Sequence, residues 1–105
     1  MATVRKEIIK GKLDKSWLDD VPEDKVFWCH DGRVVKNLEE LSNALRKMSA
    51  DTYRYHASRE KNDFSSWIRD VIGDATLARE LVKTATKTTA ARKVEMRLHS
   101  LQASF

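Results

Sequence analysis

The chain has 105 residues, 41% of them hydrophobic and 34% charged, which excludes a disordered protein and leaves room for one hydrophobic core. Three glycines and one proline supply too few turns for a β-sandwich, and the single Cys29 excludes an internal disulfide framework. No apolar run reaches the roughly 20 residues that a membrane-spanning helix needs. We expect a cytoplasmic protein of α+β, mainly α class.

The formal net charge of +4 is unevenly distributed. Residues 1–12 carry four basic residues and one acidic residue, and residues 75–105 carry six basic and two acidic residues. The segment between them carries ten basic and thirteen acidic residues. Two basic ends therefore flank an acidic middle, which is a modest indication of an anionic partner.

Residues 1–21 form an N-terminal arm, and residues 22–105 are expected to form the single domain. Gly11 interrupts the helical spacing of apolar residues in the arm, and Pro22 comes directly after the arm. The arm is therefore either a helix that ends before Val21 or a partly ordered segment that places Trp17 on the core. The apolar positions on which both alternatives depend are Ile8, Ile9, Leu13, Trp17 and Leu18.

Residues 25–35 predict a β-hairpin, because Asp31-Gly32 lies between two runs of strand-forming residues. A two-residue turn of this kind needs positive φ at both positions. A hairpin alone is marginally stable in water, so one of its faces should lie on helices.

Five helices are expected after the hairpin, at about 38–48, 50–58, 63–72, 75–85 and 87–101. Residues 63–72 show the most regular apolar spacing and should lie at the centre of the core. Glu40 at the third helical position should return a hydrogen bond to the N–H of its own cap. The expected caps are Asn37, Ser49, Asn62 or Asp63, Asp74, and Thr86.

Several runs of this chain are similar to a known family. They are Tyr55-His56, Glu60 to Phe64, and Trp67 to Asp74, together with Asp31-Gly32 and Lys36 to Leu41. From about Val26 to about Arg97 the chain resembles small prokaryotic domains, frequent in archaea, that are catalogued as a domain of unknown function. The resemblance implies an accessory or interaction module, because members occur alone or appended to larger proteins. The chain departs from the family pattern at Ala57-Ser58 and, with a more basic sequence, at Lys87-Thr88-Thr89.

Three side chains of the motif form a polar cluster: His56, Asn62 and Asp63. His56 and Asp63 could act as a general acid–base pair, but no nucleophile motif accompanies them. We favour a structural role for this cluster. An enzyme would require a pocket that joins His56 to Asp63 or Asp70.

Metal and cofactor sites are not indicated. Cys29 and His30 are adjacent in a predicted strand, so their side chains should point to opposite faces and cannot easily share a metal ion. Cys29 fits a small buried hydrophobic residue better than a nucleophile. With no catalytic motif or glycine-rich phosphate loop, we predict no catalytic residue, no metal and no cofactor.

Our first hypothesis is a non-enzymatic protein-interaction module with a protein partner, in which a homo-oligomer is possible. The alternative is a small basic protein that binds DNA or RNA through phosphate contacts. On a helical wheel Arg92 points away from Lys93 and Arg97, which favours a solvated helix over a phosphate-binding face. The residues that would contact nucleic acid are Arg5, Lys6, Lys10, Lys12, Lys83, Lys87, Arg92, Lys93 and Arg97.

Overall fold

The computed structural model describes residues 13–105, and within them a small hairpin packs beneath a helical bundle. Two short 3₁₀ turns come first, η1 (Lys15–Leu18) and η2 (Glu23–Lys25). The strands β1 (Phe27–Trp28) and β2 (Val34–Val35) follow. The helices are α2 (Leu38–Lys47), α3 (Ala50–His56), α4 (Asp63–Trp67), the π-helical turn η3 (Ile68–Ile72), α5 (Ala75–Val82) and α6 (Lys87–Ser104). The α+β, mainly α class is confirmed.

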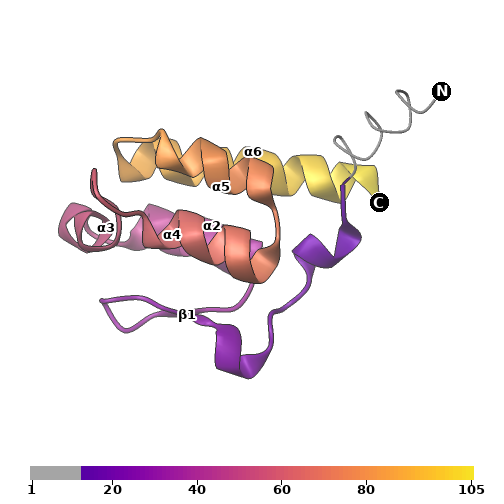
Figure 1. Ribbon diagram of the computed structural model, residues 1–105, viewed down its shortest axis with the longest axis horizontal. Helices are drawn as coiled ribbons and strands as arrows, with labels where there is room; N and C mark the ends of the chain where they lie inside the picture. Colours follow the sequence, from indigo (N-terminus) through magenta and orange to yellow (C-terminus); the bar gives the residue numbers. More distant parts are fainter. Residues whose placement is uncertain (1–12) are drawn as a thin grey trace.

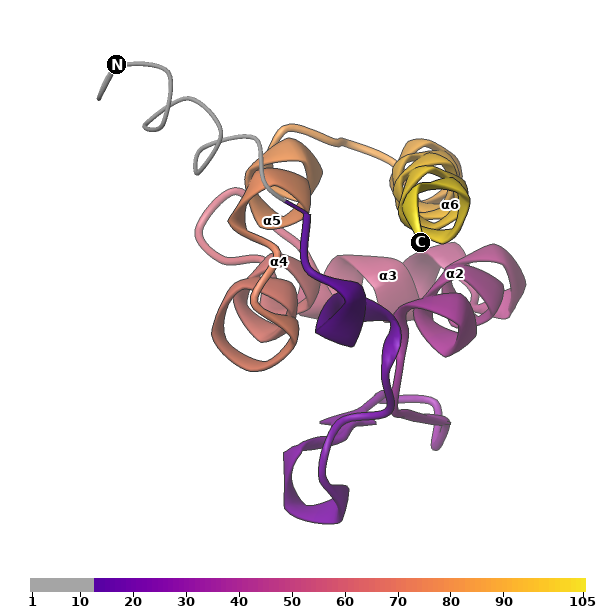
Figure 2. The ribbon, with the colours of Figure 1, turned by 90° about the vertical axis from the view of Figure 1, so that its right-hand side faces the viewer.

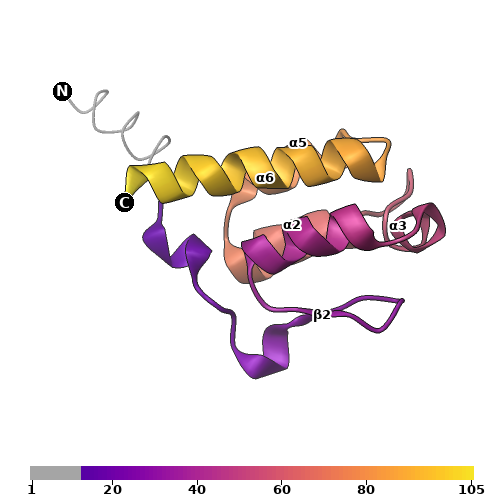
Figure 3. The same ribbon diagram turned by 180° about the vertical axis from the view of Figure 1, so that it is seen from behind.

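The helices form two layers, which Figure 2 shows end-on. The α5 and α6 helices make one layer, and α2, α3 and α4 make the other, with the hairpin on the far side of the second layer (Figures 1 and 2). Contacts between the layers are most extensive where α6 packs on α2 and where α5 packs on α4. Seen from behind, α2 runs beside the N-terminal part of the longer α6 (Figure 3).

The core lies between these layers and is apolar. Its most deeply buried side chains come from every layer, which makes the described residues one packed unit. They include Val35, Leu38, Leu41, Leu45, Phe64, Ile68, Leu81, Val94 and Leu101. In the described part of the N-terminal arm, the helical structure is the 3₁₀ turn η1. Trp17 and Leu18 of this turn pack against the core.

Side-chain caps begin the helices where the sequence predicts them. Asn37, Ser49, Asn62, Asp74 and Thr86 each accept a backbone N–H from the first turn that follows. Of the two residues considered as the cap of α4, Asn62 is the cap, and Asp63 is the first residue of the helix. We predicted that the Glu40 side chain accepts the N–H of the cap residue Asn37. It accepts the N–H of Lys36 instead, at 3.0 Å.

Three helix ends differ from the prediction, each for a local reason. The helix expected to reach residue 58 ends at His56, because Ala57 is extended and pairs with Asn62 in an isolated bridge. The helix expected to reach residue 85 ends at Val82, because the Thr84 hydroxyl donates to the carbonyl of Leu81. Val82 and Ala85, apolar residues near the end of the expected helix, are exposed. In contrast, α6 continues beyond the expected end at residue 101 to Ser104; residues 102–104 are exposed, so no buried apolar position marks this extension in the sequence.

The hairpin turn also differs from the prediction. Gly32 alone has a positive φ, +97°, and donates its N–H to the carbonyl of Cys29 at 2.9 Å. Cys29 in turn donates to the carbonyl of Arg33 at 2.8 Å, so the loop has three residues. A three-residue loop needs one left-handed residue where a two-residue loop needs two, and Gly32 supplies it.

Candidate functional site

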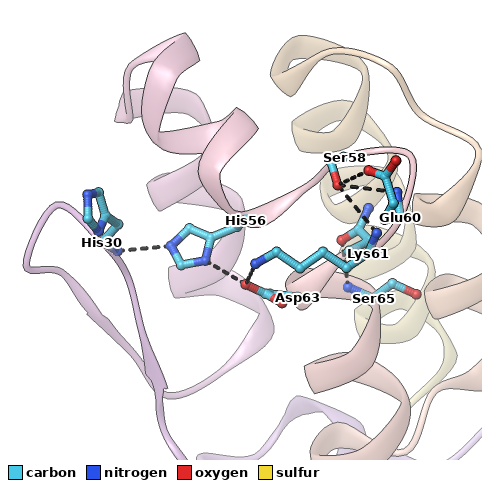
Figure 4. A network of polar contacts seen from close by, with 8 residues as sticks. His30, His56, Ser58, Glu60, Lys61, Asp63 and Ser65 are labelled. Carbon is cyan, nitrogen blue, oxygen red and sulfur yellow. Dashed lines mark hydrogen bonds and ion pairs between the residues drawn. The ribbon is translucent and has the colours of Figure 1, made fainter.

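The motif cluster centres on His56, which is only 4% exposed. Its Nε2 accepts the backbone N–H of His30 at 2.9 Å, and its Nδ1 lies 3.0 Å from a carboxylate oxygen of Asp63. The same carboxylate receives the Lys61 ammonium at 2.9 Å (Figure 4). The cluster therefore joins the hairpin loop, the end of α3 and the start of α4 in one network.

This arrangement determines the tautomer of His56. A backbone N–H can only donate, so Nε2 is the acceptor and Nδ1 carries the hydrogen given to Asp63. Partial burial of Asp63 opposes its charge, but the hydrogen bonds from Lys61 and His56 outweigh it and lower the pKa of this carboxyl group. Both ring nitrogens are engaged within the protein, so neither is free to accept a proton from a substrate.

Asp70, Cys29 and His30 were the other residues considered for catalysis or metal binding. Asp70 is exposed and pairs with Arg69 at 2.9 Å. Contrary to our prediction, Cys29 and His30 do not lie in a strand, because β1 ends at Trp28. Cys29 is buried and His30 is exposed, and burial raises the pKa of the Cys29 thiol. Within residues 13–105 no group of three His, Cys, Asp or Glu side chains could hold a metal ion.

The hairpin is fixed to the helices by aromatic rings. The ring of Phe27 lies 5.0 Å from His56, 5.1 Å from Phe64 and 5.9 Å from Trp67. The Trp67 indole also donates to the carbonyl of Lys25 at 2.8 Å. With the His56 bond at the loop, the hairpin is therefore held at both ends.

The opposite face of the hairpin carries apolar side chains into solvent. Phe27 pairs with Val35 and both are buried, whereas Trp28 pairs with Val34 and both point outward. Trp28 is 70% exposed and Val34 is 45% exposed. We call Trp28 and Val34 the hairpin patch. The alternation of side chains along the strand is the sequence signal that identifies this outward face.

The basic residues of the C-terminal region are largely committed to other parts of the chain. Arg97 donates two hydrogen bonds to the buried carboxylate of Asp74, at 2.7 and 2.9 Å. Lys93 donates to Glu80 at 2.9 Å, and Lys83 lies 3.8 Å from the same carboxylate. A phosphate would have to displace these acidic partners to reach three of the five predicted cations.

Two predicted cations remain without an acidic partner among residues 13–105. Arg92 forms no ion pair there, and Lys87 makes only a 3.5 Å contact to the carbonyl of Arg46. The other predicted contacts, Arg5, Lys6, Lys10 and Lys12, lie outside the described residues. The structure thus brings together only part of the proposed phosphate-binding set.

The helical wheel did not show that Arg92 borders the same hollow as Lys93 and Arg97. All three side chains line one groove between α5 and α6, with a volume of about 430 Å³. We call it the α5–α6 groove. Sequence reasoning missed it because the wheel describes one helix, whereas the groove depends on how α5 packs beside α6.

The fold and its polar cluster define a small helical domain with an anchored hairpin. No helix in residues 13–105 has both the length and the apolar character to cross a bilayer. The model of the family of unknown function DUF5752 matches residues 23–101, and the chain belongs to this family. No curated protein and no solved structure matches the chain.

Proposed function

We propose that this protein is a non-enzymatic interaction module that binds a protein partner through the hairpin patch. The single observation that carries the proposal is the outward orientation of Trp28, 70% exposed, beside Val34 on a hairpin that is held at both ends. Tryptophan is among the residues that most often dominate binding energy at protein interfaces.

The support beneath the patch favours binding without rearrangement. Phe27 packs on three rings, and the loop is tied to His56, so the backbone of β1 is already ordered. An ordered apolar group loses less conformational entropy on association than a flexible one. The patch therefore suits a partner with an apolar recess for the indole ring.

Nucleic-acid binding is the second candidate, and the cations Arg92 and Lys87 are the observation that favours it. Affinity that depends on several phosphate contacts falls steeply with salt. The ion pairs of Arg97 and Lys93 reduce the number of cations available for such contacts. We therefore rank it below protein binding.

The test captures partners from an extract of the native host with the full chain, with and without nuclease. Trp28→Ser is the test variant, and Phe105→Ser, which removes another exposed aromatic ring, is the matched control. We expect proteins that survive nuclease, are lost with Trp28→Ser and are kept with Phe105→Ser. Capture that requires nucleic acid, or that is indifferent to Trp28→Ser, contradicts the proposal.

A titration with duplex DNA and with structured RNA at low and moderate salt tests the second candidate directly. Binding that weakens with salt and with Arg92→Glu would establish it. No binding at either salt concentration would end it.

A further inference from the structure

The α5–α6 groove has an apolar floor. Leu77 of α5 and Met96 of α6 lie in it, and Met96 is 64% exposed although its neighbours on α6, Val94 and Leu98, are buried. Methionine adapts its shape to different apolar surfaces and is common in grooves that bind helices. The exposed thioether marks the part of the groove that a partner could cover.

The walls of the groove are positively charged. Three cations line it, and two of them already have acidic partners: Lys93 pairs with Glu80, and Arg97 pairs with the buried Asp74. Lys93 neutralises Glu80, whose pKa is lowered by the hydrogen bond and charge of this lysine. Arg92 has no acidic partner in the described part of the chain, so the groove has an unsatisfied cation at its rim.

A second hollow makes the surroundings of Arg92 more positive. Arg92 also lines a recess of about 250 Å³ between α2 and α6, together with Lys87 and with Arg46, which pairs with Glu95. Arg92 therefore lies on a ridge with cations on both sides. A carboxylate brought to this ridge would gain an ion pair without displacing an existing one.

The shape of the groove follows from its two helices. Glu80 meets Lys93 and Asp74 meets Arg97, so α5 and α6 run antiparallel along its length. The eight residues of α5 give a groove about 12 Å long, or roughly two helical turns. In helical bundles, a third helix can lie in the groove between two antiparallel helices and bury its apolar stripe against both of them.

We propose that the α5–α6 groove binds an acidic amphipathic helix of a protein partner. Its apolar stripe covers Leu77 and Met96, and a carboxylate on the flank of that helix pairs with Arg92. The charge of the groove selects an acidic helix over a basic one. This surface is separate from the hairpin patch, and the proposal does not rest on that one.

The probe is a synthetic amphipathic peptide of about 16 residues, long enough to form a helix, with a leucine stripe and glutamates on the remaining faces. The matched peptide has lysine in place of every glutamate. Each is titrated into the ¹⁵N-labelled full chain and followed by NMR. We expect the acidic peptide to shift the amides of Thr76, Thr89, Arg92 and Met96 and the basic peptide to leave them unchanged.

Two exposed substitutions test the contacts. Arg92→Glu and Met96→Glu should each weaken the acidic peptide about tenfold or more, which corresponds to about 1.4 kcal/mol. Val82→Glu is the control, because Val82 is equally exposed on α5 but lies outside the groove. Unchanged spectra of the variants away from the substitution would show that the fold persists.

Several results would overturn the proposal. They are equal binding of both peptides, no shift at millimolar peptide, or shifts confined to the hairpin. A chain that is dimeric in sedimentation and becomes monomeric with Met96→Glu would show that a second copy occupies the groove, which also contradicts it. Trp28→Ser should not affect this titration, so failure of the hairpin patch and failure of the groove are distinguishable.

Discussion

The carboxylate of Asp74 is completely buried and is held by the guanidinium of Arg97, with Nε at 2.7 Å and Nη2 at 2.9 Å. The same carboxylate accepts the N–H of Leu77 at 3.1 Å and so caps α5. The guanidinium also lies 5.6 Å from the ring centroid of Trp17. Arg97 therefore connects α6 to the start of α5 and to η1.

Arg97→Met should destabilise the protein strongly, because it leaves a charged carboxylate buried without its partner. A loss of about 3–5 kcal/mol in the free energy of unfolding is typical of such a change. Lys93→Met is the matched control: its partner Glu80 remains open to water, so the loss should be far smaller. Urea denaturation measures both variants, and equal losses would show that the Asp74 pair contributes no more than a surface pair.

His56→Ala should loosen the hairpin loop, because the N–H of His30 loses the ring nitrogen that accepts it. Removing a buried ring and two hydrogen bonds should cost roughly 2–4 kcal/mol. Hydrogen exchange of the His30 amide, followed by NMR, should become much faster in the variant than in the unsubstituted chain.

His30→Ala is the control for this prediction. His30 donates through its backbone, so the substitution keeps the bond to His56 and removes only the stacking of His30 on Tyr55, whose ring centroids are 3.9 Å apart. Protection of the amide at position 30 should therefore persist. Rapid exchange in His30→Ala would show that ring stacking, and not the His56 bond, holds the loop.

The lowered pKa of Asp63 predicts a loss of stability in acid. Burial opposes the charge of this carboxyl group, but Lys61 and His56 hold its pKa below the unfolded value of about 3.9. The folded state then binds fewer protons than the unfolded state, so the contribution is full above about pH 5 and is lost as the pH falls through the folded pKa. The free energy of unfolding should thus decrease with acid.

Asp63→Asn should flatten this acid dependence, as measured by urea denaturation at a series of pH values. Part of the slope should remain, because the pKa of Asp31 is also lowered, despite some burial, by the backbone N–H of Arg33. An unchanged slope in Asp63→Asn would mean that the carboxylate gains nothing from Lys61 and His56 in the folded state.

Local signals in the sequence predicted much of the fold. Each cap acts within three or four residues of its own helix, which is why Asn37 and Asp74 were identified from the residues alone. The apolar spacing from Phe64 to Ile72 likewise located the central helix. That spacing did not predict the π-helical turn over Ile68–Ile72, which is closed by a 2.7 Å bond from the Gly73 N–H to the Ile68 carbonyl.

The candidate sites depend on contacts between residues that are far apart in the sequence, which local patterns do not predict. The motif predicted that His56 and Asp63 would be close, because seven positions and one loop separate them. It did not predict the His30 amide as third member, because that bond spans 26 positions. The pairing of Arg97 with Asp74 and the groove beside Arg92 depend in the same way on how α6 packs against α5.

Gly73 and Gly32 both have a left-handed backbone but differ in their surroundings. Alanine at each position therefore separates the cost of backbone strain from the cost of a steric clash. Both have φ near +100°, where a residue with a Cβ atom loses roughly 1–2 kcal/mol. A Cβ at Gly32 would meet no atom within 4 Å, whereas one at Gly73 would lie 3.3 Å from Nε1 of Trp17. Gly73→Ala should therefore lower the free energy of unfolding more than Gly32→Ala. In a Trp17→Leu background the two losses should become similar, and a difference that persists there would mean that the Trp17 indole is not its cause.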